Sequence, residues 1–182
     1  MKQLLSTLLV LMSLSISAQS KYFTKTGITD FKASVEAFEP VEATNRSTTV
    51  ILNTSNGDIA ALLFVKAFHF EIALMEEHFN ENYMDSDKFP KATFKGRLEG
   101  FDMSKLSKEI TELNLRGVLN VRGKDKTIET IAKLSNVDGK ILLVADFSVA
   151  PQDFDIDIPK IVRKKIAERI NVNLNYELVQ KN

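Results

Sequence analysis

Apolar and polar residues alternate along most of this chain, which is the pattern of strands with one buried face. The clearest case is near the C-terminal end. There "INVNLNYELV" places Ile170, Val172, Leu174, Tyr176 and Leu178 on one face, with Asn or Glu between them. This segment predicts a half-buried antiparallel strand.

The same alternation recurs in earlier segments. We expect strands in "GITDFKASVEAF", "STTVILN", "KATFKGRLEG", "ELNLRGVLNVRG", "KTIETIAKL" and "KILLVADFSVA". The turn signals "SNGD" (Ser55 to Asp58) and "NVDGK" stand between neighbouring strands, and the second predicts a hairpin.

The run "DIAALLFVKAFHFEI" is bulky on both faces, so it predicts one long strand that is covered on both sides. Phe64, Phe68 and Phe70 would lie on one face of this strand. Leu63 and Val65 would lie on the other.

Two segments have helical spacing instead. In "IALMEEHFNENYM", Leu74, Met75, His78, Phe79 and Tyr83 recur every three or four residues, which predicts an amphipathic helix. The segment "IPKIVRKKIAERI" has a proline near its start, apolar residues four apart and basic residues toward its end. It predicts a short C-terminal helix.

Eight or nine strands with two short helices indicate an all-β, mainly antiparallel fold. A sheet of this size most economically closes into a barrel of about eight strands, because closure removes exposed edges. A two-sheet sandwich is the alternative fold.

The first residues are typical of a secretory signal peptide. Lys2 precedes an apolar run from Leu4 to Ile16, and the small residues of "SISAQS" suggest cleavage after Ala18. We therefore expect residues 1–18 to be removed and 19–182 to form a single exported domain, periplasmic or secreted. With no cysteine in the chain, lipid attachment at the cleavage site is excluded.

Charge and cysteine content narrow the function further. The chain has 24 basic and 24 acidic residues, so nothing favours a nucleic-acid partner, which would need a basic face. The absence of cysteine excludes disulfides, so packing must supply the stability.

The sequence does not indicate catalysis. His69 and His78 lack the spacing of a zinc motif and have no evident third ligand. Glu76 and Glu77 are adjacent, so on a helix they cannot face one another as a catalytic pair. No nucleophile motif or phosphate loop is present. We expect no enzyme activity, no metal and no cofactor, with an uncharacterised hydrolase as a distant alternative.

The segment "QDFDIDIP" also carries carboxylates, but it lacks the glycine and the glutamate that a calcium loop requires. We interpret Asp153, Asp155 and Asp157 as one side of an extended segment that discourages edge pairing.

Twelve Phe and no Trp leave one question open. Several of these rings fall on strand faces that would point into a barrel. They can fill the interior as ordinary core, or they can surround an apolar ligand. Composition does not separate the two.

The stretch "LMEEHFNENYMDSDKFPKATFKG" resembles the YceI-like family, with "EHF" on a helix and "KFPKATF" leading into a strand. "GVLNVRGKDKTIE" and "ADFSVAPQDFDI" are similar to later parts of that family. The opening strand departs from the family pattern, because "GITDFKASVEAF" lacks its usual histidine.

The resemblance implies a lipocalin-like barrel closed near its mouth by the helix, and an elongated cavity that binds polyisoprenoids or similar lipids. It also implies that a homodimer is possible, and a lipid cargo makes transient membrane contact possible. From the alternation we expect eight side chains to line the cavity: Phe64, Phe68, Phe70, Leu74, Phe79, Phe94, Leu119 and Phe147. The competing function is an interaction module with a filled barrel, whose outer face carries Leu63 and Val65.

Overall fold

The computed structural model describes residues 21–35 and 37–181, so the expected leader lies outside the described residues. These residues form one antiparallel sheet. Its strands are β1 (Lys21–Ser34), β2 (Glu42–Asn53), β3 (Asp58–Phe64), β4 (Phe68–Phe70), β5 (Lys91–Leu98), β6 (Thr111–Val121), β7 (Lys124–Val137), β8 (Lys140–Val149) and β9 (Ile166–Gln180).

The helical segments are short. They are α2 (Ala73–His78), the π-helical continuation η3 (Phe79–Tyr83), and the 3-10 turns η2 (Val65–Ala67), η4 (Met103–Lys105) and η5 (Pro151–Phe154). No helix in the described part of the chain is long and apolar enough to cross a membrane.

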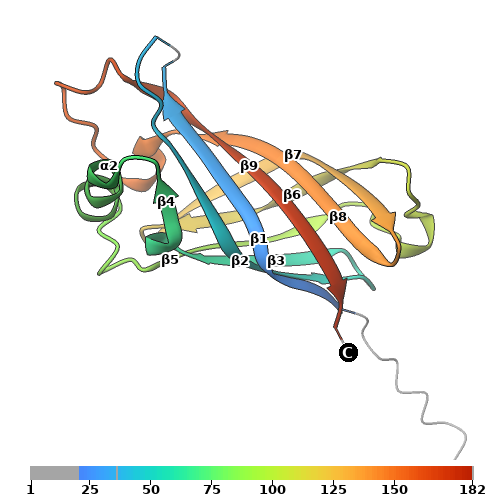
Figure 1. The fold of residues 1–182 in the computed structure, drawn as a ribbon. Helices are drawn as coiled ribbons and strands as arrows, with labels where there is room; N and C mark the ends of the chain where they lie inside the picture. Colours follow the sequence, from blue (N-terminus) through green and yellow to red (C-terminus); the bar gives the residue numbers. More distant parts are fainter. Residues whose placement is uncertain (1–20, 36, 182) are drawn as a thin grey trace, which may run out of the picture.

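The sheet closes on itself, because β1 pairs with β9 on one side and with β2 on the other. The short β4 pairs with β2 further along the side that β3 occupies, so β3 and β4 together form one side of the barrel. The result is a closed eight-stranded antiparallel barrel (Figure 1). The predicted barrel is confirmed, and the sandwich alternative is wrong.

The expected single strand "DIAALLFVKAFHFEI" is interrupted by η2. On β3, Ile59, Ala61 and Leu63 line the cavity, whereas Ala60 and Phe64 are exposed. On β4, Phe68 and Phe70 line it and His69 is exposed. The turn of three residues therefore shifts the inward positions from odd to even numbers. A strand assumed to be continuous places Phe64 on the wrong face.

The expected C-terminal helix is wrong. Residues 160–165 form turns, and β9 begins at Ile166. A spacing of four residues fits a helix, but it is also even and so fits one face of a strand. Ile166 pairs with Ser34 of β1 and Ile170 with Val149 of β8, and these ladders decide the conformation.

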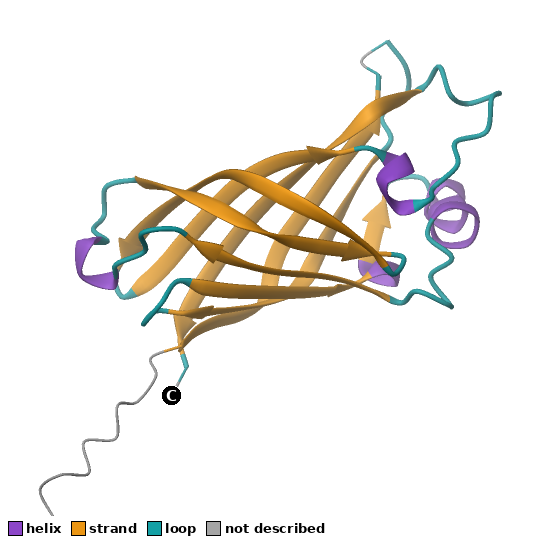
Figure 2. Cartoon of the chain, turned by 180° about the vertical axis from the view of Figure 1, so that it is seen from behind, coloured by secondary structure: helices purple, strands orange, loops and turns teal. Residues whose placement is uncertain are grey.

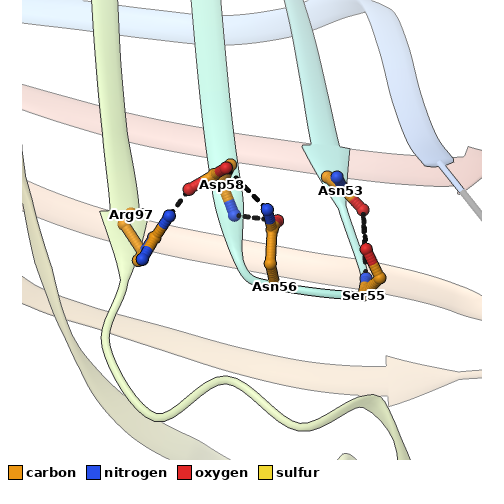
Figure 3. Close-up of polar contacts among 5 residues, drawn as sticks. All are labelled: Asn53, Ser55, Asn56, Asp58 and Arg97. Atoms are coloured by element: carbon orange, nitrogen blue, oxygen red, sulfur yellow. Dashed lines mark hydrogen bonds and ion pairs between the residues drawn. The ribbon is translucent and has the colours of Figure 1, made fainter. Parts of the chain in front are cut away.

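The expected turns are confirmed. Asp138 and Gly139 both have positive φ between β7 and β8, as a two-residue hairpin turn requires. Figure 3 shows the turn between β2 and β3, where Asn56 and Arg97 both bond to Asp58. The Arg97 guanidinium, 2.7 Å from Asp58, holds the pKa of that carboxyl below its ordinary value.

The two ends of the barrel differ. Helix α2, the β1–β2 loop and residues 158–165 lie together at one end, which we call the mouth end, and the C-terminus lies at the other, the closed end (Figures 1 and 2). Fully buried side chains fill the closed end, among them Leu52, Leu98, Leu134, Ile141, Leu143 and Leu178.

Candidate ligand-binding cavity

The barrel interior is filled at the closed end and hollow toward the mouth end. The hollow has a volume of about 430 Å³, within the range of roughly 300–1,000 Å³ that is usual for small-molecule sites. Its walls are mostly apolar and come from every side of the barrel. The exposed residues Glu39, His78 and Lys165 also line it, so the cavity communicates with the surface at the mouth end.

Four phenylalanines form one corner of the cavity, which we call the aromatic corner. Phe31 of β1 lies 5.1 Å from Phe68 and 5.3 Å from Phe79, measured between ring centroids. Phe70 lies 5.1 Å from Phe79. These contacts, which are edge-to-face for Phe31 and Phe68, stacked for Phe31 and Phe79, and tilted for Phe70 and Phe79, are favourable ring geometries. They fasten the helical segment to the barrel wall.

The helical segment from α2 to η3 covers this corner as a lid. Met75, Phe79 and Tyr83 line the cavity from it. Glu76 holds its start, because its carboxylate accepts the backbone N–H of Phe70 at 3.1 Å. The expected helix is confirmed, although its second half is π-helical.

A second cap comes from η5, between β8 and β9. Phe154 is buried and lines the cavity. Lys126 bonds to Asp153 at 2.7 Å and Lys124 to Asp155 at 2.6 Å, and each contact lowers the pKa of its carboxyl. The extended segment expected here is wrong, since two of its three carboxylates fasten η5 to the β6–β7 hairpin.

Two glycines make room for a ring on the barrel wall. Gly96 and Gly117 pair directly across β5 and β6. A Cβ at Gly117 would lie 2.5 Å from the ring of Phe94, and one at Gly96 would lie 2.7 Å from it. The ring therefore lies flat over both glycines, a familiar aromatic–glycine arrangement in sheets.

Three hydroxyls interrupt the apolar surface at the inner end of the cavity. Thr29 Oγ1 lies 2.9 Å from Thr48 Oγ1 and 3.0 Å from the Tyr176 hydroxyl, and all three residues line the cavity. We call this group the hydroxyl cluster. Burial raises the pKa of Tyr176 to about 12, so its phenol stays protonated at ordinary pH.

The structure brings most of the sequence-predicted residues together on the cavity wall. Phe94 and Leu119 face it from the paired strands β5 and β6, and Phe147 from β8. The six predicted residues that line it are Phe68, Phe70, Phe79, Phe94, Leu119 and Phe147. Whether they contact a ligand remains a prediction.

Two predicted residues do not line the cavity. Phe64 is 51% exposed because the shift at η2 turns it outward, and Lys91 lies over its ring. Leu74 is 57% exposed because the lid presents its Met75 and Phe79 face to the barrel instead.

Sequence reasoning also missed residues that do line the cavity. Leu63 and Val65 face inward, although we expected them on the outer surface. Thr29 and Phe31 follow the inward alternation of β1, so the pattern contained a signal for both. Val162 contributes from a segment expected to be helical. Nothing in the sequence indicated that three distant hydroxyls would meet.

His69 lies on the outside of the barrel, with its Nδ1 3.7 Å from the Glu76 carboxylate. Within residues 21–35 and 37–181, no group of three or more His, Asp or Glu side chains could hold a metal ion.

The chain is thus a closed antiparallel barrel with a helix-covered apolar cavity, an architecture with room for one small ligand. The family model for the YceI-like domain matches residues 13–178. The chain therefore belongs to the YceI-like domain family, as the resemblance indicated. No curated protein matches the chain.

Solved structures share this fold at low sequence identity. A polyisoprenoid binding domain from Saccharophagus degradans, implicated in plant cell wall breakdown, has a TM-score of 0.76 at 10% identity, covering 88% of this chain and 98% of that one. Burkholderia cenocepacia BcnA has a TM-score of 0.67 at 13% identity, covering 84% and 96%. The Campylobacter jejuni YceI protein has a TM-score of 0.64 at 16% identity, covering 80% and 87%.

Proposed function

We propose that this protein is an exported, non-enzymatic carrier that holds a long apolar lipid of the polyisoprenoid kind. The observation that carries the proposal is the apolar cavity that runs from the filled closed end to the mouth end. Family membership and the fold shared with a polyisoprenoid binding domain support the ligand class. The leader pattern of residues 1–18 supports a periplasmic or secreted location.

The energetics favour exchange with a membrane over capture from water. An isoprenoid tail gains roughly 0.8 kcal/mol per CH₂ on leaving water, but such a lipid already sits in hydrocarbon inside a bilayer. Its transfer into an apolar barrel is therefore close to neutral. Cavity shape and opening of the lid then decide binding, which suits a carrier that loads and unloads at membranes.

The mouth end has the surface that such exchange requires. Ile161 is 89% exposed, and Phe38 and Leu74 are exposed on the neighbouring loop and lid. Residues 160–165 also contain four basic residues and no acidic one. Exposed apolar side chains beside basic ones suit the interface of an anionic membrane. We propose that the mouth end contacts the membrane transiently.

Two adjacent alanines of β3 provide the test. Ala61 lines the cavity, whereas Ala60 is exposed on the outer face. Ala61→Phe fills the hollow, so we expect it to weaken binding of a fluorescent prenyl alcohol at least tenfold. The control Ala60→Phe adds the same ring outside and should bind like the wild type. Equal effects of the two variants, or no effect of either, contradict the proposal.

The cargo itself can be identified from protein purified from its own compartment. Solvent extraction and mass spectrometry should release a stoichiometric long-chain lipid. If the folded protein yields no lipid and does not bind added prenyl alcohols, the proposed carrier function is contradicted.

The interaction module is less well supported. That function requires a filled barrel and an apolar outer face at Leu63 and Val65. The barrel is instead hollow toward the mouth end, and both residues line its cavity.

A further inference from the structure

The hydroxyl cluster is a polar site at the inner end of the cavity, where its neighbours Ile59, Leu115 and Leu143 are apolar. Thr48, Thr29 and Tyr176 come from β2, β1 and β9, three neighbouring strands, so the cluster spans one side of the barrel. Their exposed fractions are only 1%, 5% and 3%. Burying a hydroxyl is costly unless hydrogen bonds compensate for the lost contact with water. Each donor and acceptor of the three groups should therefore have a partner.

Counting protons shows that the pairing is incomplete. Three hydroxyls carry three O–H donors, and each hydrogen bond between them uses one donor. The two contacts, Thr48 to Thr29 and Thr29 to Tyr176, use two. No further hydrogen bond joins these hydroxyls to the described residues, so one donor remains free beside the cavity that all three residues line. Several oxygen lone pairs also remain.

The residues around the hydroxyl cluster are small or apolar, so they offer no charge to a ligand head group. Gly27 lies against the Tyr176 ring, where a Cβ would come within 2.7 Å, so its missing side chain leaves the space that the ring occupies. Ile59, Leu115 and Leu143 line the cavity around its inner end and belong to the filled core.

Among residues 21–35 and 37–181, the charged side chains that line the cavity lie at the mouth end. They are Glu39 and Lys165, and His78 also lines the cavity at this end. A charged head group would therefore be left unpaired beside the hydroxyl cluster, at a large desolvation cost. A neutral oxygen would accept the free O–H and satisfy it.

We propose that the hydroxyl cluster of Thr29, Thr48 and Tyr176 is a head-group site for an uncharged oxygen acceptor. The ligand class is an apolar chain ending in an alcohol, ether or ketone oxygen, which enters the barrel polar end first. This inference rests on the proposed carrier function and specifies the cargo of the same cavity. It also predicts that the tail, and not the head, faces the mouth.

Single substitutions are a poor test, because removing a hydroxyl from either end of the cluster still leaves one free donor on the remaining pair. The decisive variant replaces all three groups: Thr29→Val, Thr48→Val and Tyr176→Phe together. Replacing every partner by an apolar group of similar shape is close to neutral for stability. Its melting temperature should therefore stay near that of the wild type.

Three probes share one chain: geranylgeraniol, the hydrocarbon in which hydrogen replaces its hydroxyl, and geranylgeranyl phosphate. We expect the ratio of alcohol affinity to hydrocarbon affinity to be about tenfold higher in the wild type than in the triple variant, the value of one hydrogen bond to a buried donor. The hydration free energy of each probe is the same in both experiments, so it cancels when the ratio for the wild type is compared with the ratio for the triple variant. Affinity for the phosphate should change little.

An unchanged ratio overturns the head-group site. A loss of phosphate affinity equal to that of the alcohol overturns its restriction to uncharged groups. If both probes bind but the ratio of alcohol affinity to hydrocarbon affinity is the same in the two proteins, the carrier function stands and only the head-group site fails. If no probe binds the wild type, both fail.

A crystal structure of the wild-type complex with geranylgeraniol tests the orientation independently of any variant. The ligand oxygen should lie at hydrogen-bonding distance, about 2.5–3.0 Å, from one of the three hydroxyl oxygens. A ligand oxygen beside Lys165, with its tail at the hydroxyl cluster, overturns the proposal.

Discussion

At the scale of single residues, Tyr176 shows how one side chain depends on several strands. Its ring needs the missing side chain of Gly27, and its hydroxyl needs Thr29. Burial then raises the pKa of the phenol from 10.0 to about 12. An apolar environment that excludes water disfavours the phenolate.

This shift predicts a loss of stability at high pH. Between pH 10 and 12 the unfolded chain loses the Tyr176 proton before the folded protein does, so the free energy of unfolding falls as pH rises. Two pKa units correspond to roughly 3 kcal/mol. Tyr176→Phe should remove this part of the decline in urea unfolding measured from pH 9 to 12. Parallel curves for both proteins would show that the phenol does not carry the effect.

At the scale of elements, short irregular segments decide what the cavity contains. The 3-10 turn η2 exchanges the inward and outward positions between β3 and β4. The lid combines one turn of α-helix with a π-helical turn, and only one side of it faces the barrel. On that side Phe79 contacts three rings of the aromatic corner.

We therefore expect Phe79→Ala to loosen the lid, because it removes ring contacts with Phe31, Phe68 and Phe70. The expected cost is about 2–3 kcal/mol of stability, below that of a fully buried ring because Phe79 is half-buried. Hydrogen exchange of residues 73–83 should accelerate, and so should release of a bound prenyl alcohol.

The matched control is Leu74→Ala, which shortens an exposed side chain on the outer side of the same helix. It should leave both rates close to those of the wild type. If the two variants behave alike, the aromatic corner does not hold the lid.

At the scale of the whole molecule, the barrel is polarised along its axis. The closed end has a dense core and the mouth end has the cavity. The lid and the basic, apolar turn at residues 160–165 also lie at the mouth end (Figure 1). A carrier with this arrangement should approach a membrane with one end only.

Two exposed isoleucines test that polarity. Ile161→Ser removes an apolar contact at the mouth end and should slow transfer of a fluorescent prenyl lipid from vesicles containing anionic phospholipid, by about threefold to tenfold. Ile110→Ser changes a residue that is 69% exposed just before β6, at the closed end, and should leave the rate unchanged. Raised salt should slow the wild type because it screens the basic residues. Equal slowing by both variants would contradict a single membrane-facing end.

The sequence alone determined most of the strands, the two turns and the helical segment that forms the lid, because period-two alternation, helical spacing and glycine-containing turns are local properties. Most of the residues that it indicated for the cavity do lie on the wall, and Phe94, Leu119 and Phe147 among them lie on regular strands. The alternation of β9 even placed Tyr176 correctly on the inner face.

Tertiary structure decided the rest. Residues four apart satisfy both a helix and a strand, so only the pairing of Ile166 with β1 and of Ile170 with β8 made this segment a strand. The turn η2 reversed the faces of Phe64 and Leu63. The hydroxyl cluster joins residues up to 147 positions apart in the chain. Closure of the sheet alone brings such residues together, and no local pattern records it.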